Sequence, residues 1–413
     1  MHPLIIANAE QIVTPRSRAA PQRGKAMGII RVWKNKSISL DPKTGKIIAI
    51  GPWRKVKEKN AKVIEGKNHL VFPGFVDSHT HPIYAGSRVN EYLLRGEGVP
   101  YLEILAKGGG ILATVRATEK ASNALLTQRT LRVLRTMMTH GTTTLEAKTG
   151  YGLSTKQELR ELKILQRLKK LSPMELFITF LGAHAIPERY RTRPNAYIDL
   201  ICNTMLPQIA KRKLADFCDV FCEEGVFSVR QGRKILEMAI QLGIKIRVHA
   251  DEFKPIGGTE LGVSLKAFSV DHLMGISETG IRILSRSDTA AILLPCTSFF
   301  LGKETYAPAQ ELIHAGAIVA LATDFNAGSN QSYSMQMAAS LGLLKMKMTP
   351  EQVLVATTLH GAYALGISDR VGSLHPGKQA DLVLIEGDDY REVFYRFGTN
   401  QVKTVIKRGK VVS

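Results

Sequence analysis

Eight short apolar segments recur between residues 73 and 324, and they constrain the fold more than any other feature of the sequence. We expect strands at 73–79, 143–150, 176–183, 217–223, 245–250, 267–272, 289–295 and 318–324. Helical spacing separates most of them, and Ser154 with Gln157 and Ser228 with Gln231 have the spacing of capping boxes. This alternation predicts an α/β protein built as a parallel (β/α)8 TIM barrel. A doubly wound sheet is the alternative, but no Gly-x-Gly-x-x-Gly follows an early strand.

Both ends of the chain also contain strand-like segments, several before residue 70 and others after residue 380. Because these ends flank the barrel, we predict that they pack together as one small antiparallel β-sandwich domain. The predicted domains are 1–70 plus 375–413 for the sandwich and 71–374 for the metal-dependent catalytic barrel.

The formal net charge of +20 raises the possibility of a nucleic-acid-binding protein, which we keep as the alternative from a different class. The basic residues are dispersed, however, and no stripe with interleaved aromatic residues is visible. A solvated basic surface that attracts a small anionic substrate is the better interpretation. We therefore expect no nucleic acid among the partners.

No apolar run reaches the ~20 residues that a membrane span needs, and the first residues do not resemble a secretory leader. The four cysteines are widely scattered, which favours inert core thiols over a disulfide framework. We expect a cytoplasmic protein without a membrane partner.

Histidines and carboxylates stand where the predicted strands end, and in a TIM barrel the chemistry lies at those ends. His79 and His81 follow the first strand at a spacing that directs both side chains to the same side. Taken singly, each polar residue could cap a helix or bond a loop carbonyl. Together they predict one site, and converging imidazoles suit Zn or a similar metal. The others at these ends are Glu146, Lys148, Tyr151, His184, Glu223, Glu224, His249, Glu252, Asp271, His272, Asp324 and Asn326.

This order, His-x-His after the first strand, His after the fifth and sixth, and Asp after the eighth, resembles the amidohydrolase superfamily of metal-dependent hydrolases. The resemblance implies a barrel joined to a small sandwich of both chain ends. It also implies the metal ligands His79, His81, His249 and Asp324. Binuclear members carry a modified lysine after the fourth strand, which this chain lacks, so one metal ion per subunit is expected. Zn is favoured, Fe is possible, and either would lower the pKa of a bound water, for Zn toward ~7.

Further motifs narrow the resemblance to one family of cyclic amidohydrolases. That family opens the ring amide of a small anion, an imidazolone ring with a propionate tail, in histidine degradation, and it forms homodimers. The clearest departure from it is the basic stretch 15–26. A guanine- or cytosine-type deaminase is the alternative within the superfamily. The motifs are Tyr84–Glu91, Gly108–Thr118, Lys148–Gly152, Thr179–His184, Ala322–Ser329 and Gly372–Asp381.

The resemblance and the chemistry of the side chains together suggest roles for single residues. Asp324 would take a proton from the attacking water, Asp324 or Glu252 would pass it to the leaving ring nitrogen, and His272 would stabilise the oxyanion. The expected substrate-binding residues are Arg88, Tyr101, Tyr151, His184, Glu252, Asn326, Gly328 and Ser329.

These roles have alternatives in ordinary structure. Arg88 can hold a propionate through two parallel N–H bonds, or it can form a surface salt bridge. His184 is expected to donate to the substrate, Glu252 could instead cap a helix, and Gly328 and Ser329 could offer free backbone N–H groups or begin a helix capped by Ser329. The run Gly108–Gly110 is interpreted as a flexible active-site loop.

Overall fold

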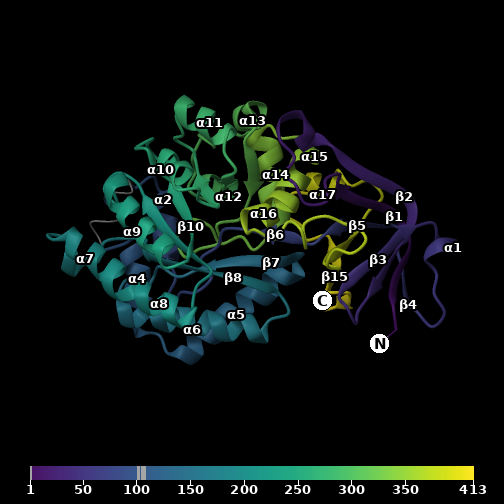
Figure 1. The fold of residues 1–413 in the computed structure, drawn as a ribbon, viewed down its shortest axis with the longest axis horizontal. Coiled ribbons are helices and arrows are strands. Elements are labelled where there is room, and N and C mark those ends of the chain that lie inside the picture. Colours follow the sequence, from purple (N-terminus) through teal and green to yellow (C-terminus); the bar gives the residue numbers. More distant parts are fainter. Residues whose placement is uncertain (1, 100–102, 104–107) are drawn as a thin grey trace.

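The computed structural model describes every residue except 1, 100–102 and 104–107. It consists of a (β/α)8 barrel and a separate sheet, which lie beside each other along the long axis (Figure 1). The sheet contains strands from both ends of the chain, coloured purple and yellow in Figure 1. The predicted α/β fold, a TIM barrel with a second domain from both termini, is confirmed.

The eight predicted barrel strands are all present and pair in parallel in chain order. The barrel closes where Thr80 bridges Phe325, because the Asp324 N–H donates to the His79 carbonyl at 3.0 Å. The strands are buried on both faces, as a barrel covered by helices requires. They are β6 (Phe75–Asp77), β7 (Thr142–Lys148), β8 (Glu175–Ala183), β9 (Phe217–Cys222), β10 (Lys245–Ala250), β11 (Ser269–His272), β12 (Ala290–Leu293) and β13 (Ile318–Leu321).

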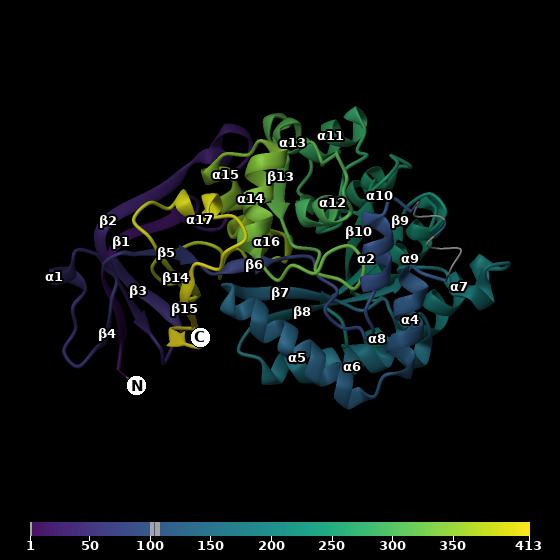
Figure 2. The ribbon, with the colours of Figure 1, turned by 180° about the vertical axis from the view of Figure 1, so that it is seen from behind.

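Helices surround the barrel strands (Figure 2). Ser228 and Gln231 form the predicted capping box of α9, and Ser154 caps α6 by accepting from the Gln157 N–H. Within the described part of the chain, every helix is too short or too polar to cross a membrane. The main barrel helices are α5 (Asn123–Thr139), α6 (Thr155–Leu171), α8 (Leu206–Arg212), α9 (Val229–Gln241), α10 (Gly258–Ser264), α11 (Glu278–Ser285), α13 (Ala309–Ala315), α14 (Met335–Met346), α15 (Pro350–Thr357) and α16 (Leu359–Ala364).

Two further helices, α2 (Val89–Gly96) and α4 (Ile111–Lys120), lie in the long connection between β6 and β7. This connection follows the histidine pair directly, and it holds both Arg88 and the glycine run 108–110. The connection therefore begins at the carboxyl end of β6, where we predicted the site. All four cysteines are buried and free, as expected for core thiols.

The small domain is one curled sheet, and the prediction that it is wholly antiparallel is wrong. The strand β1 pairs in parallel with both β4 and β5, because the connection through α1 (Trp53–Val56) returns the chain to the starting end of β1. The curl brings Lys46 against Gln379 and encloses an apolar cluster. The strands are β1 (Leu4–Pro15), β2 (Ile30–Asp41), β3 (Lys46–Gly51), β4 (Lys62–Glu65), β5 (His69–Pro73), β14 (Leu382–Glu386), β15 (Val402–Lys407) and β16 (Lys410–Val411).

The predicted domain limits, 1–70 plus 375–413 and 71–374, remain a proposal. In their support, β5 of the small sheet ends at Pro73 and β6 of the barrel begins at Phe75. Gly74 joins the two strands, and a Cβ on it would stand 2.3 Å from the Thr143 side chain. Only a glycine fits at this crossing between the two parts.

The basic stretch 15–26 ties the small sheet to the amino-terminal end of the barrel. The Arg23 guanidinium donates to the carbonyls of Ser287 at 2.8 Å and Ser285 at 3.3 Å, just before β12. Met27 is fully buried in the barrel core. The stretch, with Met27 directly after it, is therefore an interdomain contact through Arg23, while Arg16, Arg18 and Lys25 remain exposed.

His360 should make the contact between the stretch 15–26 and the barrel less stable at low pH. Its Nε2 accepts from the Gln22 N–H at 3.0 Å and its Nδ1 donates to the Val319 carbonyl at 2.7 Å, so the ring is neutral. Burial lowers the pKa of His360 to about 4. An unfolded histidine titrates near ~6.5, so the stabilisation is complete above that pH and is lost as the pH falls toward the folded value.

We therefore expect the free-energy advantage of the unchanged protein over His360→Gln to shrink by about 2–3 kcal/mol between pH 7 and about 4.5. Urea unfolding of both proteins at the two pH values measures this difference. Parallel pH profiles for the two proteins would contradict the assignment.

Candidate metal centre and active site

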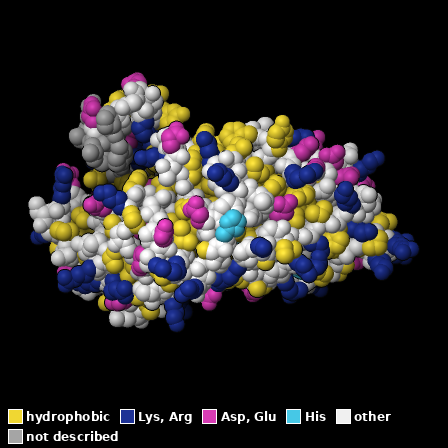
Figure 3. Space-filling view, turned by 90° about the horizontal axis from the view of Figure 1, so that it is seen from above, with side chains coloured by type: hydrophobic (Ala, Val, Ile, Leu, Met, Phe, Trp, Pro, Cys, Tyr) yellow, Lys and Arg dark blue, Asp and Glu magenta, His cyan; other side chains and the backbone are white. Residues whose placement is uncertain are grey.

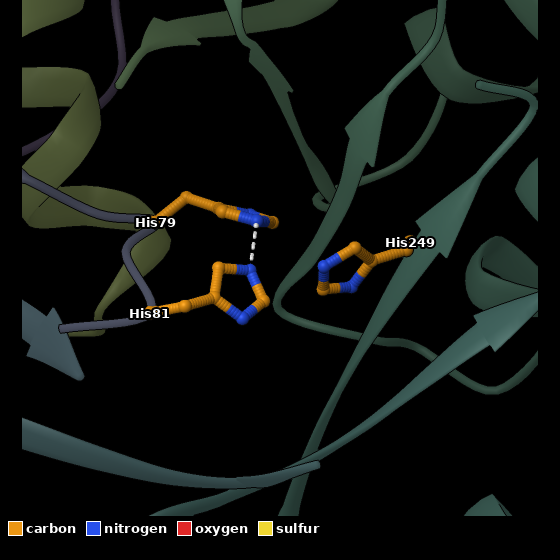
Figure 4. A group of neighbouring side chains, drawn as sticks. All are labelled: His79, His81 and His249. Carbon is orange, nitrogen blue, oxygen red and sulfur yellow. Dashed lines mark hydrogen bonds between the residues drawn. The ribbon is translucent and has the colours of Figure 1, made fainter. Parts of the chain in front are cut away.

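Three buried histidines meet at the carboxyl end of the barrel. His79 and His81 follow β6, His249 lies on β10, and the three rings face one another across the barrel mouth (Figure 4). One ring nitrogen from each lies within 4.8 Å of the others. His79 Nε2 and His81 Nε2 are 3.3 Å apart. This group is suited to a metal ion.

Asp324 approaches the same point from the end of β13. Its Oδ1 lies 3.6 Å from His79 Nε2 and 3.5 Å from His81 Nε2, while its Oδ2 accepts from the Thr297 hydroxyl at 2.5 Å. Ligand atoms held at ~2.1 Å around a tetrahedral ion stand about 3.4 Å apart. The three observed separations therefore fit a metal ion between these side chains.

The protonation of the rings supports the same conclusion. His79 Nδ1 lies 2.6 Å from Asp271 Oδ2, and a carboxylate can only accept, so Nδ1 carries the proton and the Nε2 lone pair faces the site. His249 Nδ1 lies 3.0 Å from Asp219 Oδ2, an ion-pair distance, and neither ring nitrogen of His249 has a hydrogen-bond partner among the described residues. Burial holds the pKa of His79 well below its usual range. A neutral His79 with its Nε2 lone pair facing the site has the protonation state that metal binding requires.

A cavity of about 380 Å³ opens from this centre. Besides the metal-site residues His81, His249 and Asp324, it is lined by His272 and by every predicted substrate-binding residue that the structure describes: Arg88, Tyr151, His184, Glu252, Asn326, Gly328 and Ser329. Tyr101, also predicted to bind substrate, lies outside the described residues. The lining further includes Arg95, Phe221 and Lys303, which no strand-end pattern indicated because they lie on a helix, inside a strand and on a loop.

Arg88 lies flat against Gly328 in this cavity, since a Cβ on Gly328 would stand 1.8 Å from Arg88 Nη1. Its Nε and Nη2 donate to Glu91 Oε2 at 3.0 and 2.7 Å. The other carboxylate oxygen, Oε1, accepts from the Gly110 N–H at 3.1 Å. Arg88 thus forms an ion pair and also faces the cavity, and Glu91 links it to the glycine run. Its role in substrate binding stays a prediction.

The loop after Asp324 is already hydrogen-bonded to itself. The Asn326 side-chain oxygen accepts from the backbone N–H groups of Gly328 and Ser329, both at 2.8 Å. The expectation that these N–H groups are free is therefore wrong, because a local asparagine turn occupies them. The alternative that Ser329 caps a helix is also wrong, since Ser334 caps α14.

His184 stacks on His81 with ring centroids 5.1 Å apart, and its Nδ1 donates to the Gly150 carbonyl at 3.0 Å. Burial, assisted by His249, lowers the pKa of His184 to about 3, so the ring is neutral. Its Nε2 can then only accept. The predicted role as a donor is corrected to that of an acceptor, which suits a substrate ring N–H.

Glu252 and His272 line the same cavity, with Glu252 Oε2 3.8 Å from His272 Nδ1. Burial, with smaller effects of Asp324 and Glu223, raises the pKa of Glu252 to about 8. The carboxyl group is therefore protonated near neutral pH and can donate. His272 has a left-handed backbone with φ of 81°, a strained conformation of the kind that gathers at functional sites.

Two residues predicted at the rim lie deeper. Glu146 and Lys148 are fully buried inside the barrel, beneath the histidines. Asp219 and Arg247 join them there and were missed as site residues. The available signal was a charge at an alternate position of an otherwise apolar strand, as in Phe217–Cys222, where a barrel interior has no water to solvate it.

Comparison with known proteins settles the family. The family model described as "Amidohydrolase family" matches residues 70–412. The chain belongs to this family. Within it, the chain is 44% identical over 411 residues to the imidazolonepropionase of Alkaliphilus oremlandii, covering 98% of this chain and 97% of that protein. The imidazolonepropionase of Geobacillus kaustophilus is 42% identical over 419 residues, covering 100% and 98%.

The likeness of this amidohydrolase to imidazolonepropionases thus extends through the small domain, further than the motifs indicated. Its fold is also similar to that of E. coli guanine deaminase, with a TM-score of 0.76 and 14% identity, covering 100% of this chain and 98% of that one. A 5-methylcytosine deaminase from Klebsiella pneumoniae gives a TM-score of 0.73 at 19% identity, with the same coverage. At these identities the deaminases show the fold alone.

Proposed function

We propose that this amidohydrolase is an imidazolonepropionase. It hydrolyses the ring amide of 4-imidazolone-5-propanoate and releases N-formimidoyl-L-glutamate, a step of histidine degradation. The observation that carries the proposal is that Arg88, a side chain able to hold a carboxylate, faces the same cavity as the histidine centre. The full-length relatives point to the same reaction.

The proposed cofactor is one metal ion per subunit, with Zn favoured and Fe as the alternative, held by His79, His81, His249 and Asp324. It would supply a water molecule of lowered pKa and polarise the ring carbonyl. The nitrogen and carboxylate donors suit both metals. The residue after β9 is Glu223 rather than a lysine, which supports one ion rather than two.

The chain's own residues move the protons. Asp324, whose Oδ1 faces the histidines while Thr297 holds its Oδ2, takes a proton from the attacking water. Protonated Glu252, or Asp324 itself, delivers a proton to the ring nitrogen as the amide C–N bond breaks. His272 donates a hydrogen bond to the carbonyl oxygen as negative charge develops there. Tyr151 and His184 bind the polar atoms of the ring and the tail, whereas the Asn326 side chain shapes the loop through its hydrogen bonds to Asp324, Gly328 and Ser329.

An assay of the purified protein on imidazolone propionate, guanine and cytosine, combined with metal analysis, tests this function. We expect turnover of the imidazolone and about one equivalent of metal per subunit. Turnover of a purine or pyrimidine without the imidazolone would instead support the deaminase alternative, which needs no carboxylate clamp.

The different-class alternative, nucleic-acid binding, has little support. Figure 3 shows Lys and Arg side chains spread over one face of the molecule and interspersed with Asp and Glu. DNA binding with an affinity that falls steeply as the salt concentration rises would be required to support this alternative. We propose instead that the partners are the small anionic substrate and a second copy of the chain in a homodimer, and that the enzyme acts in the cytoplasm.

A further inference from the structure

Five charged side chains fill the barrel interior beneath the histidines, and no step of the proposed reaction uses them. They come from four different strands and all are fully buried: Glu146, Lys148, Asp219, Arg247 and Asp271. Charges in such a place are stable only when each is paired. Their arrangement therefore indicates what holds the histidines from behind.

Lys148 contacts all three carboxylates of this group. Its ammonium donates to Glu146 Oε1 at 2.8 Å and to Asp219 Oδ2 at 2.7 Å, and it lies 3.8 Å from Asp271 Oδ2. Arg247 lies near two of the same carboxylates, with Nη2 3.7 Å from Asp271 Oδ2 and Nη1 3.7 Å from Glu146 Oε1. One cation thus reaches all three carboxylates.

Two of these carboxylates are the ones that hold the histidine rings. Asp271 Oδ2 accepts from His79 Nδ1 at 2.6 Å, and Asp219 Oδ2 lies 3.0 Å from His249 Nδ1. In both cases the oxygen that faces the histidine is also the oxygen nearest the Lys148 ammonium. A ring is held in one tautomer and orientation only while its carboxylate stays in place.

We propose that Lys148 is a positioning residue of the metal centre. By holding Asp219 and Asp271, it keeps the protons of His249 and His79 on Nδ1 and their Nε2 lone pairs aimed at one point. The inference rests on the metal site proposed above. It makes the metal affinity of that site depend on a side chain that contacts neither the metal-binding histidines nor the substrate.

The test compares Lys148→Met with Lys378→Met in the full-length protein. Lys378 is a matched control, because it is 1% exposed and its ammonium is bound by the carbonyls of Arg18, Ser368 and Val371 and by the Ser373 hydroxyl, without a carboxylate. Zn2+ affinity is measured by competition with a fluorescent chelator. Histidine 15N shifts of the metal-free proteins report which ring nitrogen carries the proton.

We expect Lys148→Met to weaken Zn2+ binding by about 10- to 100-fold and to alter the 15N signals of His79 and His249. Lys378→Met should lower thermal stability while leaving both readouts unchanged. Equal losses of Zn2+ affinity in the two variants would overturn the proposal, because both would then reflect general destabilisation. Unchanged Zn2+ affinity in a folded Lys148→Met would overturn it as well.

If Lys148→Met does not fold, Asp271→Asn keeps the size of the carboxylate and tests the same link. It should weaken Zn2+ binding and shift the His79 signals, and unaltered values would overturn the proposal. Failure of the metal site itself is recognised separately, because the unchanged protein and a His79→Ala, His249→Ala double variant would then bind Zn2+ equally.

Discussion

Replacing Asp324 with alanine should lower kcat by about 10²- to 10⁴-fold, the range that a positioned general base contributes. The loss should exceed that caused by replacing Arg88, Thr297 or Gly328, because one oxygen of the Asp324 carboxylate faces His79 and His81 while the other is held by Thr297. The variant should also bind less metal. Steady-state kinetics on imidazolone propionate, together with metal analysis of the same preparation, measure both effects.

Thr297→Val is the matched control for this change. It removes the 2.5 Å hydrogen bond to Asp324 Oδ2 but keeps the carboxylate, so metal should be retained and kcat should fall far less than in Asp324→Ala. Robust turnover in Asp324→Ala would refute the role given to this residue. Full metal content with lost turnover would show that Asp324 acts as a base without being a ligand.

Replacing Arg88 with methionine should raise KM by about 10²- to 10³-fold with little change in kcat. Two hydrogen bonds to a charged group, at about 1.5–3 kcal/mol each, correspond to about 10²- to 10⁴-fold, and partial replacement by water keeps the expected loss in the lower part of that range. The propionate contact exists in the bound substrate and in the transition state alike, so its loss weakens binding without slowing the chemical step. A loss confined to kcat would contradict a tail-binding Arg88.

Gly328→Ala tests the same contact without removing a charge. The added methyl group would stand 1.8 Å from Arg88 Nη1 and must displace the guanidinium, so KM should again rise. Glu91→Gln, which weakens the ion pair but leaves Arg88 in place, is the control and should retain substrate binding better than either variant. If Gly328→Ala binds substrate normally, Arg88 does not act from its position against Gly328.

Most of the barrel was predictable from local pattern. Each of the eight strands is a short apolar run bounded by a helix signal, and such runs are recognisable because both faces of a barrel strand are buried. The pair His79 and His81 was predictable for a similar reason, since strand geometry alone directs residues at i and i+2 to one side. Serines that cap the start of a helix, such as Ser228, were equally predictable, because the capping serine and the N–H that it accepts from are only three residues apart.

The wrong predictions concern strands and hydrogen-bonding groups whose partners are far away in the sequence, and one turn whose hydrogen bonds we did not predict. The parallel pairing of β1 with β4 and β5 depends on a chain reversal through α1, which no strand pattern records. The N–H groups of Gly328 and Ser329 are taken by Asn326, a local turn that competes with a ligand for the same donors. His184 is an acceptor instead of the predicted donor because its Nδ1 donates to the Gly150 carbonyl, 34 positions away in the sequence.

The sequence alone was therefore sufficient to predict a barrel of eight strands with histidines and an aspartate at its carboxyl end, because periodicity and strand ends are local properties. The three-dimensional fold decided the tautomers, the cavity and the buried charges around Lys148, because these depend on distances between segments far apart in the chain, such as His79 and Asp271, which are 192 residues apart. A local pattern can show that a histidine is present, whereas only its neighbours in space decide which nitrogen carries the proton.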